Sequence, residues 1–542
     1  MTGRTSGPRP EPDEQRPAGF GPPPAPFAAP PPLPPLPPPA LPAPPAPPAP
    51  PAPFTPTAPR SGGRPRLPRP VVAVGAALAL LAALLLIGGG AYRLTVRGGP
   101  AQPLAGPSGS PSVDQGDGKG PGGGSDSYDP NAGIRTGEAR VWVRDNQAEV
   151  AGAGVSQYGP WRVGDTVVSA IPTGLTGYAV ADGQEKWKLP LQTPLCGVPP
   201  APSAHGKLVV GVKESTSESS RCTHLQQIDL ATGRAGWKIA LPPENDHDTT
   251  TQFELAISGD TVVVGRPAVM SGFSVTDGHK LFGTSSPNGC YPSASAGGSR
   301  LIGIRRCPDP NDVHARGQEM VEELDPATGA ARWSYKYAPD WTVGRVLSVD
   351  PLVVAAHHKE KKTWNLTAFA ADGTVRSQST PAFGVSGRCN GFGNASGFQE
   401  CYAAAADADS LYIGAGKPGT TLDTEVTDQV VAVDLNTGKE RWRTAEQPKG
   451  RTMWPLAVED GRVLTYVTPG NNEAGAVVSL AAADGASQPA LQSPAAARGA
   501  EGVFYPHGIR IAWAGGRLFL LNGRVNSPEP RKASRAILSF GK

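Results

Sequence analysis

The chain has 542 residues, a formal net charge of +3, 68 glycines and 62 prolines. Roughly half of the prolines lie before residue 71, so a proline-rich segment precedes a long part of more ordinary composition. Residues 133–542 carry almost no net charge. This argues against nucleic acid as a partner, because phosphate binding needs clustered Lys and Arg.

Residues 1–70 form a proline-rich tail. The run PPPLPPLPPPALPAPPAPPAPPAP cannot form a helix or a sheet, because proline lacks the amide hydrogen and fixes φ. We expect this tail to be disordered or polyproline II in conformation. It acts either as a solvated spacer or as a ligand for aromatic grooves.

Residues 71–92 carry no charge and predict a transmembrane helix, because 22 residues of helix span roughly 33 Å. Four arginines precede the segment and two follow it: Arg60, Arg64, Arg66, Arg69, Arg93 and Arg97. The positive-inside rule then places the tail in the cytoplasm and the rest outside the cell membrane. A cleaved signal peptide is the alternative, but the apolar run exceeds the usual length of about 7–15 residues.

Residues 93–132 are rich in Gly, Ser, Pro and Asp and predict a flexible linker. The folded domain is then expected over residues 133–542.

All six cysteines follow the predicted membrane segment: Cys196, Cys222, Cys290, Cys307, Cys389 and Cys401. An even number on one side of a membrane segment indicates disulfides in an oxidising compartment, although six unpaired thiols are the alternative. Of the roughly 15 possible pairings, we favour the sequential pairs 196–222, 290–307 and 389–401, because neighbouring strands or one loop would join them.

A repeat runs through the large domain. It consists of a strand, an Asp-x-x-Thr-Gly turn or a shorter form, and a second strand that often carries Trp. The four best copies contain Asp182, Gly183 and Trp187; Asp229, Gly233 and Trp237; Asp325, Gly329 and Trp333; and Asp434, Gly438 and Trp442. Weaker copies centre on Gly278, Gly373 and Gly485, and neighbouring copies are 44 to 65 residues apart. This spacing is typical of propeller blades, in which the aromatic residue can fill the gap between adjacent blades.

The end of the chain predicts how the ring closes. Residues 516–521 and 536–542 read as two strands of a last blade, but no Thr-Gly turn follows them. The missing turn and strand occur at residues 136–143, where Thr136-Gly137 precedes Trp142. We therefore predict an all-β fold, an eight-bladed β-propeller whose N-terminal strand completes the last blade, with seven blades as the alternative.

The pattern Ala-x-Asp-x-x-Thr-Gly-x-x-x-Trp resembles the PQQ-like, or quinoprotein-type, β-propeller repeat, here in a membrane-anchored bacterial form. That family includes quinoprotein dehydrogenases, a non-enzymatic lipoprotein that assists outer-membrane assembly, and sensor domains of bacterial kinases. The resemblance implies the fold and leaves several functions open. The chain lacks the adjacent cysteines of the alcohol dehydrogenases and an obvious set of calcium ligands.

Sequence motifs for catalysis or metal binding are weak. His357 and His358 are adjacent, so on a strand they would face opposite ways, and we interpret them as part of a loop or rim. Residues 244–248 and 309–312 are acidic but do not match an EF-hand, and we expect solvated loops. We predict no catalytic residue, no metal and no cofactor.

We therefore expect a non-enzymatic binding, scaffold or sensor module, with a protein or small-molecule ligand on the propeller face. The interaction surface is expected in the insertion at residues 383–418, which we predict to stand out from the ring. The alternative is a quinoprotein-like dehydrogenase that uses PQQ and calcium.

Overall fold

The computed structural model describes residues 128–542 except 151, 218, 245–249, 284–288, 310–316, 386–397, 400, 417–426, 506–507 and 529–533. The chain divides into two units, Met1–Gln115 and Gly116–Lys542, and every described residue belongs to the second. The predicted tail, the predicted membrane segment and most of the predicted linker thus lie outside the described residues. Within the described residues, no helix has the length and apolarity needed to span a bilayer.

Eight antiparallel sheets of four or five strands form the ring, and we number them as blades in chain order. Blade 1 has β3 (Tyr158–Val163), β4 (Thr166–Ile171), β5 (Gly174–Ala179) and β6 (Glu185–Pro190). Blade 2 has β7 (Leu195–Gly197), β8 (Lys207–Lys213), β9 (Cys222–Asp229) and β10 (Arg234–Ala240). Blade 3 has β11 (Glu254–Ser258), β12 (Thr261–Arg266), β13 (Val269–Ser274) and β14 (Lys280–Phe282). Blade 4 has β15 (Tyr291–Ala296), β16 (Leu301–Cys307), β17 (Gln318–Leu324) and β18 (Ala331–Lys336).

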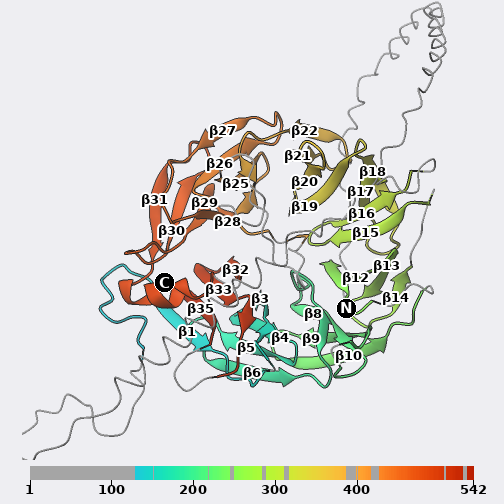
Figure 1. Ribbon diagram of the computed structural model, residues 1–542. Helices are drawn as coiled ribbons and strands as arrows, with labels where there is room; N and C mark the ends of the chain where they lie inside the picture. Colours follow the sequence, from blue (N-terminus) through green and yellow to red (C-terminus); the bar gives the residue numbers. More distant parts are fainter. Residues whose placement is uncertain are drawn as a thin grey trace, which may run out of the picture. The chain divides into compact units, whose positions relative to one another are not determined.

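The second half of the ring follows the same order. Blade 5 has β19 (Trp341–Val349), β20 (Leu352–His358), β21 (Thr363–Phe369) and β22 (Val375–Ser379). In blade 6, β23 (Gly384–Val385) and β24 (Ala404–Ala406) both pair with β25 (Ser410–Gly416), which precedes β26 (Gln429–Asp434) and β27 (Glu440–Arg443). Blade 7 has β28 (Met453–Glu459), β29 (Arg462–Val467), β30 (Ala476–Ala481) and β31 (Ser487–Gln492). Figure 1 shows the ring, with β3, β19, β28 and β32 toward its centre and β6, β10, β27 and β31 toward its rim.

Blade 8 joins the two ends of the domain. It has β32 (Ile509–Ala514), β33 (Arg517–Asn522), β35 (Arg535–Gly541) and, as its outer strand, β1 (Arg140–Asp145). β1 pairs with β35 from Arg140 opposite Gly541 onward, and a short pair, β2 (Val155–Ser156) with β34 (Arg524–Val525), adds to the closure. The structure therefore confirms the predicted all-β propeller with eight blades rather than seven. Two short helical turns, η2 (Ala495–Ala497) and α2 (Arg498–Gly502), precede β32.

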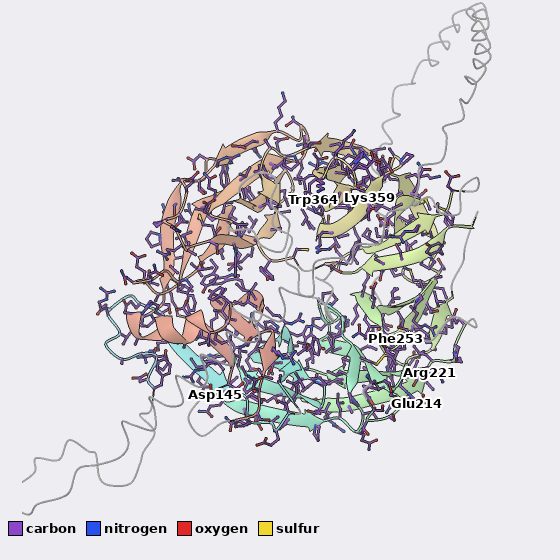
Figure 2. The ribbon with its side chains drawn as sticks, viewed as in Figure 1. Asp145, Glu214, Arg221, Phe253, Lys359 and Trp364 are labelled. Carbon is purple, nitrogen blue, oxygen red and sulfur yellow. A yellow bond between two sulfur atoms is a disulfide. The ribbon has the colours of Figure 1, made fainter. Side chains whose placement is uncertain are left out.

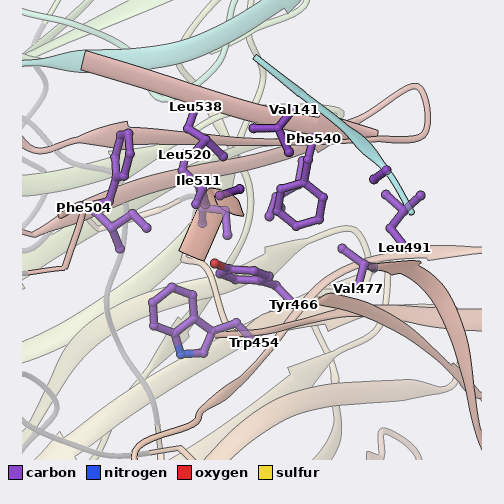
Figure 3. Close-up of a cluster of buried hydrophobic side chains, with 14 of the residues drawn as sticks. Val141, Trp454, Tyr466, Val477, Leu491, Phe504, Ile511, Leu520, Leu538 and Phe540 are labelled. Carbon is purple, nitrogen blue, oxygen red and sulfur yellow. The ribbon is translucent and has the colours of Figure 1, made fainter. Parts of the chain in front are cut away.

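The hydrophobic core consists of eight clusters, and each lies between two neighbouring blades. This follows from strand geometry, because alternate side chains of each sheet face the blade before and the blade after it. The largest cluster joins blades 7 and 8 and includes Tyr466, Phe504 and Phe540 (Figure 3). The smallest joins blades 3 and 4 and has four buried members, Val263, Met270, Leu301 and Leu324.

The turns of the repeat support this packing. Asp434 accepts hydrogen bonds from the amides of Asn436 (2.9 Å) and Thr437 (2.8 Å), and Gly438 follows with a φ of 70°. Asp182, Asp229 and Asp325 accept equivalent bonds in their own turns. The side chains thus hold a turn in which glycine supplies the positive φ.

All but one of the turn glycines of blades 1–7 also contact an aromatic ring from the blade before them. A Cβ atom at Gly233 would lie 2.4 Å from the ring of Trp187, so the indole rests directly on the backbone of the turn. The same contact joins Trp142 to Gly183, Trp237 to Gly278, Phe282 to Gly329, Trp333 to Gly373 and Trp442 to Gly485. Gly438 meets Ser379 and Gln378 instead, because β22 has no aromatic residue. The repeat therefore couples consecutive blades.

Candidate functional site

A cavity of about 380 Å³ lies among the inner strands of the ring, and we call it the central cavity. Strands β3, β19, β24, β28 and β32 contribute to its wall. The lining residues are Pro160, Pro200, Val346, Leu347, Ser348, Val349, Gln399, Cys401, Tyr402, Ala404, Ala405, Ala406, Leu456, Ala457, Val458, Ile511, Ala512 and Trp513. None of these residues is charged, so the wall presents mainly apolar side chains and neutral polar groups.

Gln399 connects two distant blades at this cavity. Its side-chain oxygen accepts a hydrogen bond from the amide of Gly297 (2.7 Å), and its side-chain amide donates to the carbonyl of the same residue. Gly297 follows β15 in blade 4, whereas Gln399 precedes β24 in blade 6. The backbone carbonyl of Phe398 also accepts a bond from Val346 of blade 5 (2.9 Å).

These contacts correct the prediction only for the described part of the insertion at residues 383–418. Gln399, Cys401 and Tyr402 are all buried, at 7–8% exposure, and residues 404–406 form the inner strand β24. The described part of the insertion therefore packs into the ring rather than standing out from it. Residues 386–397, 400 and 417–418 lie outside the described residues. No motif marked Gln399, since its role depends on a glycine about 100 residues away.

The charged groups next to the central cavity already have protein partners. Arg510 precedes the lining residue Ile511, donates to the carbonyl of Gln157 (2.6 Å) and lies 5.2 Å from the ring centroid of Tyr158. Burial lowers the pKa of Arg510. Trp513 donates its indole N–H to Glu459 (2.9 Å). These two interactions join blade 8 to blades 1 and 7.

The central cavity does not fit a quinone cofactor of the PQQ type. Such a cofactor carries carboxylates and is held with a calcium ion, so its site needs cationic side chains and acidic ligands. The lining residues supply neither. Across the described parts of the chain, no group of three or more His, Cys, Asp or Glu residues is placed to hold a metal ion.

The residues considered for metal binding have other partners. His357 packs on Trp364 and His358 on Trp341, each with ring centroids 5.0 Å apart, at the end of blade 5 where Figure 2 shows Trp364 and Lys359. The histidines therefore belong to strand β20 rather than to a loop, and His358 is buried.

Glu244 precedes a segment outside the described residues and is less solvated than predicted. Its carboxylate accepts hydrogen bonds from Ser271 (2.5 Å), Arg266 (3.2 Å) and Lys280 (2.7 Å). For the second acidic segment, residues 309–312, only Asp309 is among the described residues, because residues 310–316 lie outside them.

Two of the predicted disulfides are present, Cys196–Cys222 in blade 2 and Cys290–Cys307 in blade 4. Cys401 is also disulfide-bonded, and Cys389, the partner that we predicted for it, lies outside the described residues.

A buried acid lies between blades 7 and 8, away from the central cavity. Glu501 of α2 is fully buried, and one carboxylate oxygen accepts hydrogen bonds from the amide of Gly475 (3.0 Å) and the hydroxyl of Tyr466 (3.1 Å). The other oxygen makes no hydrogen bond of ordinary geometry within the described residues, although the Ser493 hydroxyl lies near enough to oppose the rise in the pKa of Glu501. Burial raises the pKa of Glu501 to about 7. The sequence holds no signal for this group, because α2 was not predicted.

Part of the chain is similar to a known protein family. Residues 128–289 match a family model described as outer membrane protein assembly factor BamB. No curated protein sequence is significantly similar to the chain. Among solved structures, BamB from Moraxella catarrhalis is 15% identical, with a TM-score of 0.38, and the match covers 72% of this chain and 99% of that one.

Quinohemoprotein alcohol dehydrogenases are similar to a comparable extent. The enzyme from Comamonas testosteroni is 12% identical with a TM-score of 0.42, covering 75% of this chain and 76% of that one. ADHIIG from Pseudomonas putida HK5 is 12% identical with a TM-score of 0.40, covering 73% and 78%.

Proposed function

We propose that this chain, a PQQ-like β-propeller repeat protein, is a binding module that is anchored in the cell membrane and recognises a partner or ligand outside the cytoplasm without chemically changing it. The observation that carries the proposal is the central cavity, whose eighteen lining residues are all uncharged. Such a wall favours an uncharged ligand group over a charged substrate, because a buried charge needs a partner.

Two observations support the extracytoplasmic location. Disulfides persist in oxidising compartments, and Cys196–Cys222 and Cys290–Cys307 lie within separate blades. The sequence adds an uncharged segment at residues 71–92 with more arginines before it than after it. Together these features favour a propeller held outside the membrane by an N-terminal anchor.

The alternative is a quinoprotein-like dehydrogenase, and a thermal-shift titration distinguishes it. The full-length chain, purified in detergent, is titrated with PQQ in the presence of calcium. A ligand that binds only the folded state raises the melting temperature with concentration. We expect no shift, because the central cavity offers the cofactor no charged group. A saturable rise in Tm would refute the proposal and direct attention to dehydrogenase assays.

The proline-rich tail separates a scaffold from a sensor. A scaffold acting only outside the membrane needs residues 71–542, whereas a sensor needs the tail to pass its signal to a cytoplasmic partner. Deleting residues 1–60 is expected to leave the function intact. Its loss, with normal amounts of protein in the membrane, would favour the sensor.

A further inference from the structure

A second cavity, of about 580 Å³, lies between blades 3 and 4, and we call it the blade 3–4 pocket. Strand pairing places Glu254, Gly265 and Met270 in one row across β11, β12 and β13. Val263 and Met270 belong to the cluster shared with blade 4, and side chains alternate along a strand, so this row faces blade 4. Tyr291 and Pro292 of β15 form the opposite wall.

The backbone of Gly265 forms the floor of the pocket, because this residue has no side chain to cover it. A Cβ atom there would lie only 3.3 Å from the Cβ of Glu254. The glycine therefore leaves a notch between an acidic side chain and the apolar side chain of Met270. The cavity as a whole, at about 580 Å³, has room for a side chain of a ligand.

The interface between blades 3 and 4 is closed at one end and open at the other. At the closed end, Ser258 of β11 forms a bridge with Gly298, and its hydroxyl donates to the carbonyl of that residue (3.1 Å). Glu254 begins the same strand at the open end. Between the ends, blade 4 contributes the ion pair Arg305–Glu322 (2.5 Å) in place of apolar side chains. The two blades are thus held together by hydrogen bonds at one end, and few apolar side chains pack between them.

Glu254 is the chemically distinctive group of the pocket. No hydrogen bond or ion pair joins its carboxylate to any described residue, although the side chain is solvent-accessible. The surrounding protein partly desolvates the group, and this burial raises its pKa. Arg266 also lines the pocket, but its guanidinium donates to Glu244 (3.2 Å) and to the carbonyl of Pro242 (3.1 Å). A carboxylate that lacks a partner is stabilised by a cation that enters the pocket.

We propose that the blade 3–4 pocket binds the side chain of a lysine or arginine from a protein partner. The carboxylate of Glu254 would meet the charged end, and Met270 and Pro292 would cover the methylene stem. The inference rests on the proposed binding function and names the chemistry of the partner. It places recognition of a charged side chain at one end of the interface between two blades, apart from the central cavity.

Saturation-transfer NMR on the full-length chain in detergent tests the proposal, with Nα-acetyl-lysine methylamide and Nα-acetyl-arginine methylamide as probes. The neutral control is Nα-acetyl-norleucine methylamide, which keeps a stem of similar length. We expect the charged probes to bind at least about tenfold more tightly than the neutral one, because a charge-assisted hydrogen bond is lost. Affinity should fall as the pH is lowered through the raised pKa of Glu254.

Three variants locate the binding. Glu254→Gln keeps the shape and removes the charge, and it should abolish the preference for the charged probes. Gly265→Ala partly fills the notch and should weaken all three probes. Glu446→Gln changes an exposed acid in the loop after β27 and should have no effect. Thermal melts of each variant establish that the protein is folded.

Equal binding of the charged and neutral probes, or binding of the lysine probe that survives Glu254→Gln, would overturn the proposal. n-Butylammonium distinguishes the source of the cation: binding of this free amine that is as tight as that of the peptide probes would favour a small amine over a protein side chain and also count against the proposal. The PQQ titration is independent of these results, so failure of the pocket and failure of the proposed function are told apart.

Discussion

Replacing Glu501 with glutamine tests whether a buried carboxyl makes the stability of the propeller depend on pH. Glutamine keeps the size of the side chain and an oxygen to accept hydrogen bonds from Gly475 and Tyr466. Its amide takes the place of the carboxylate oxygen that makes no hydrogen bond of ordinary geometry in the described structure. The substitution therefore imitates protonated Glu501 and removes only the ability to ionise.

The expected magnitude follows from the pKa of Glu501. An unperturbed glutamate has a pKa near 4.5, and burial raises it to about 7 in the folded protein. Between these values the folded state binds more protons than the unfolded state, so the free energy of unfolding decreases as the pH rises. The stabilisation by protonation is complete below the unfolded value and is lost as the pH passes through about 7. Above that point the wild type is destabilised by up to about 3 kcal/mol.

Chemical unfolding of both proteins at several pH values measures the effect. Near pH 5 the variant and the wild type should be equally stable, and near pH 8 Glu501→Gln should be more stable by up to about 3 kcal/mol. Glu446→Gln, in an exposed loop, serves as the control and should show no gain at either pH. A difference between variant and wild type that does not change with pH would refute the reasoning, because it would mean that Glu501 does not titrate in this range.

Three further changes test the packing of the blades. Trp187→Ala should lower the free energy of unfolding by about 3 kcal/mol in a denaturant titration, because the indole ring no longer packs on Gly233 of the next blade. Cys196→Ser with Cys222→Ser should cost about 3 kcal/mol and remove the effect of a reducing agent on blade 2, as measured by thermal melts. Glu322→Leu should cost about 3–5 kcal/mol because buried Arg305 loses its carboxylate partner, whereas adding Arg305→Met should restore most of the loss. A double variant no more stable than the single one would contradict this account.

The repeat predicted the number of blades because its signal is local. An Asp-x-x-Thr-Gly turn such as that at Asp434 makes its hydrogen bonds within a few residues, and the spacing of the copies then sets the size of each blade. The closure at β1 was predictable for the same reason, since Thr136-Gly137 and Trp142 repeat that turn away from any complete blade. Local chemistry, repeated at a regular interval, is what a sequence displays directly.

The candidate sites depend on residues that are distant in the sequence. Gln399 acquires its role only because the fold brings it next to Gly297, which lies two blades earlier in the sequence. Nothing in the sequence distinguishes Glu254 from other glutamates, because only the strand register places Gly265 and Met270 beside it. Neither arrangement follows from a pattern of neighbouring residues, because strand register and the order of blades determine it.

The two cavities differ in chemistry in a way that bears on how a partner would bind. The central cavity is uncharged and is crossed by a link between blades 4 and 6, so entry of a polar chain there would have to compete with the hydrogen bonds of Gln399. The blade 3–4 pocket presents a carboxylate without a partner at the open end of the interface with the fewest buried apolar residues. Displacing a satisfied amide costs free energy, whereas pairing a lone carboxylate lowers it. Recognition of a charged partner is therefore favoured at the pocket between blades, and the centre of the ring is better suited to holding the blades together or to an uncharged ligand.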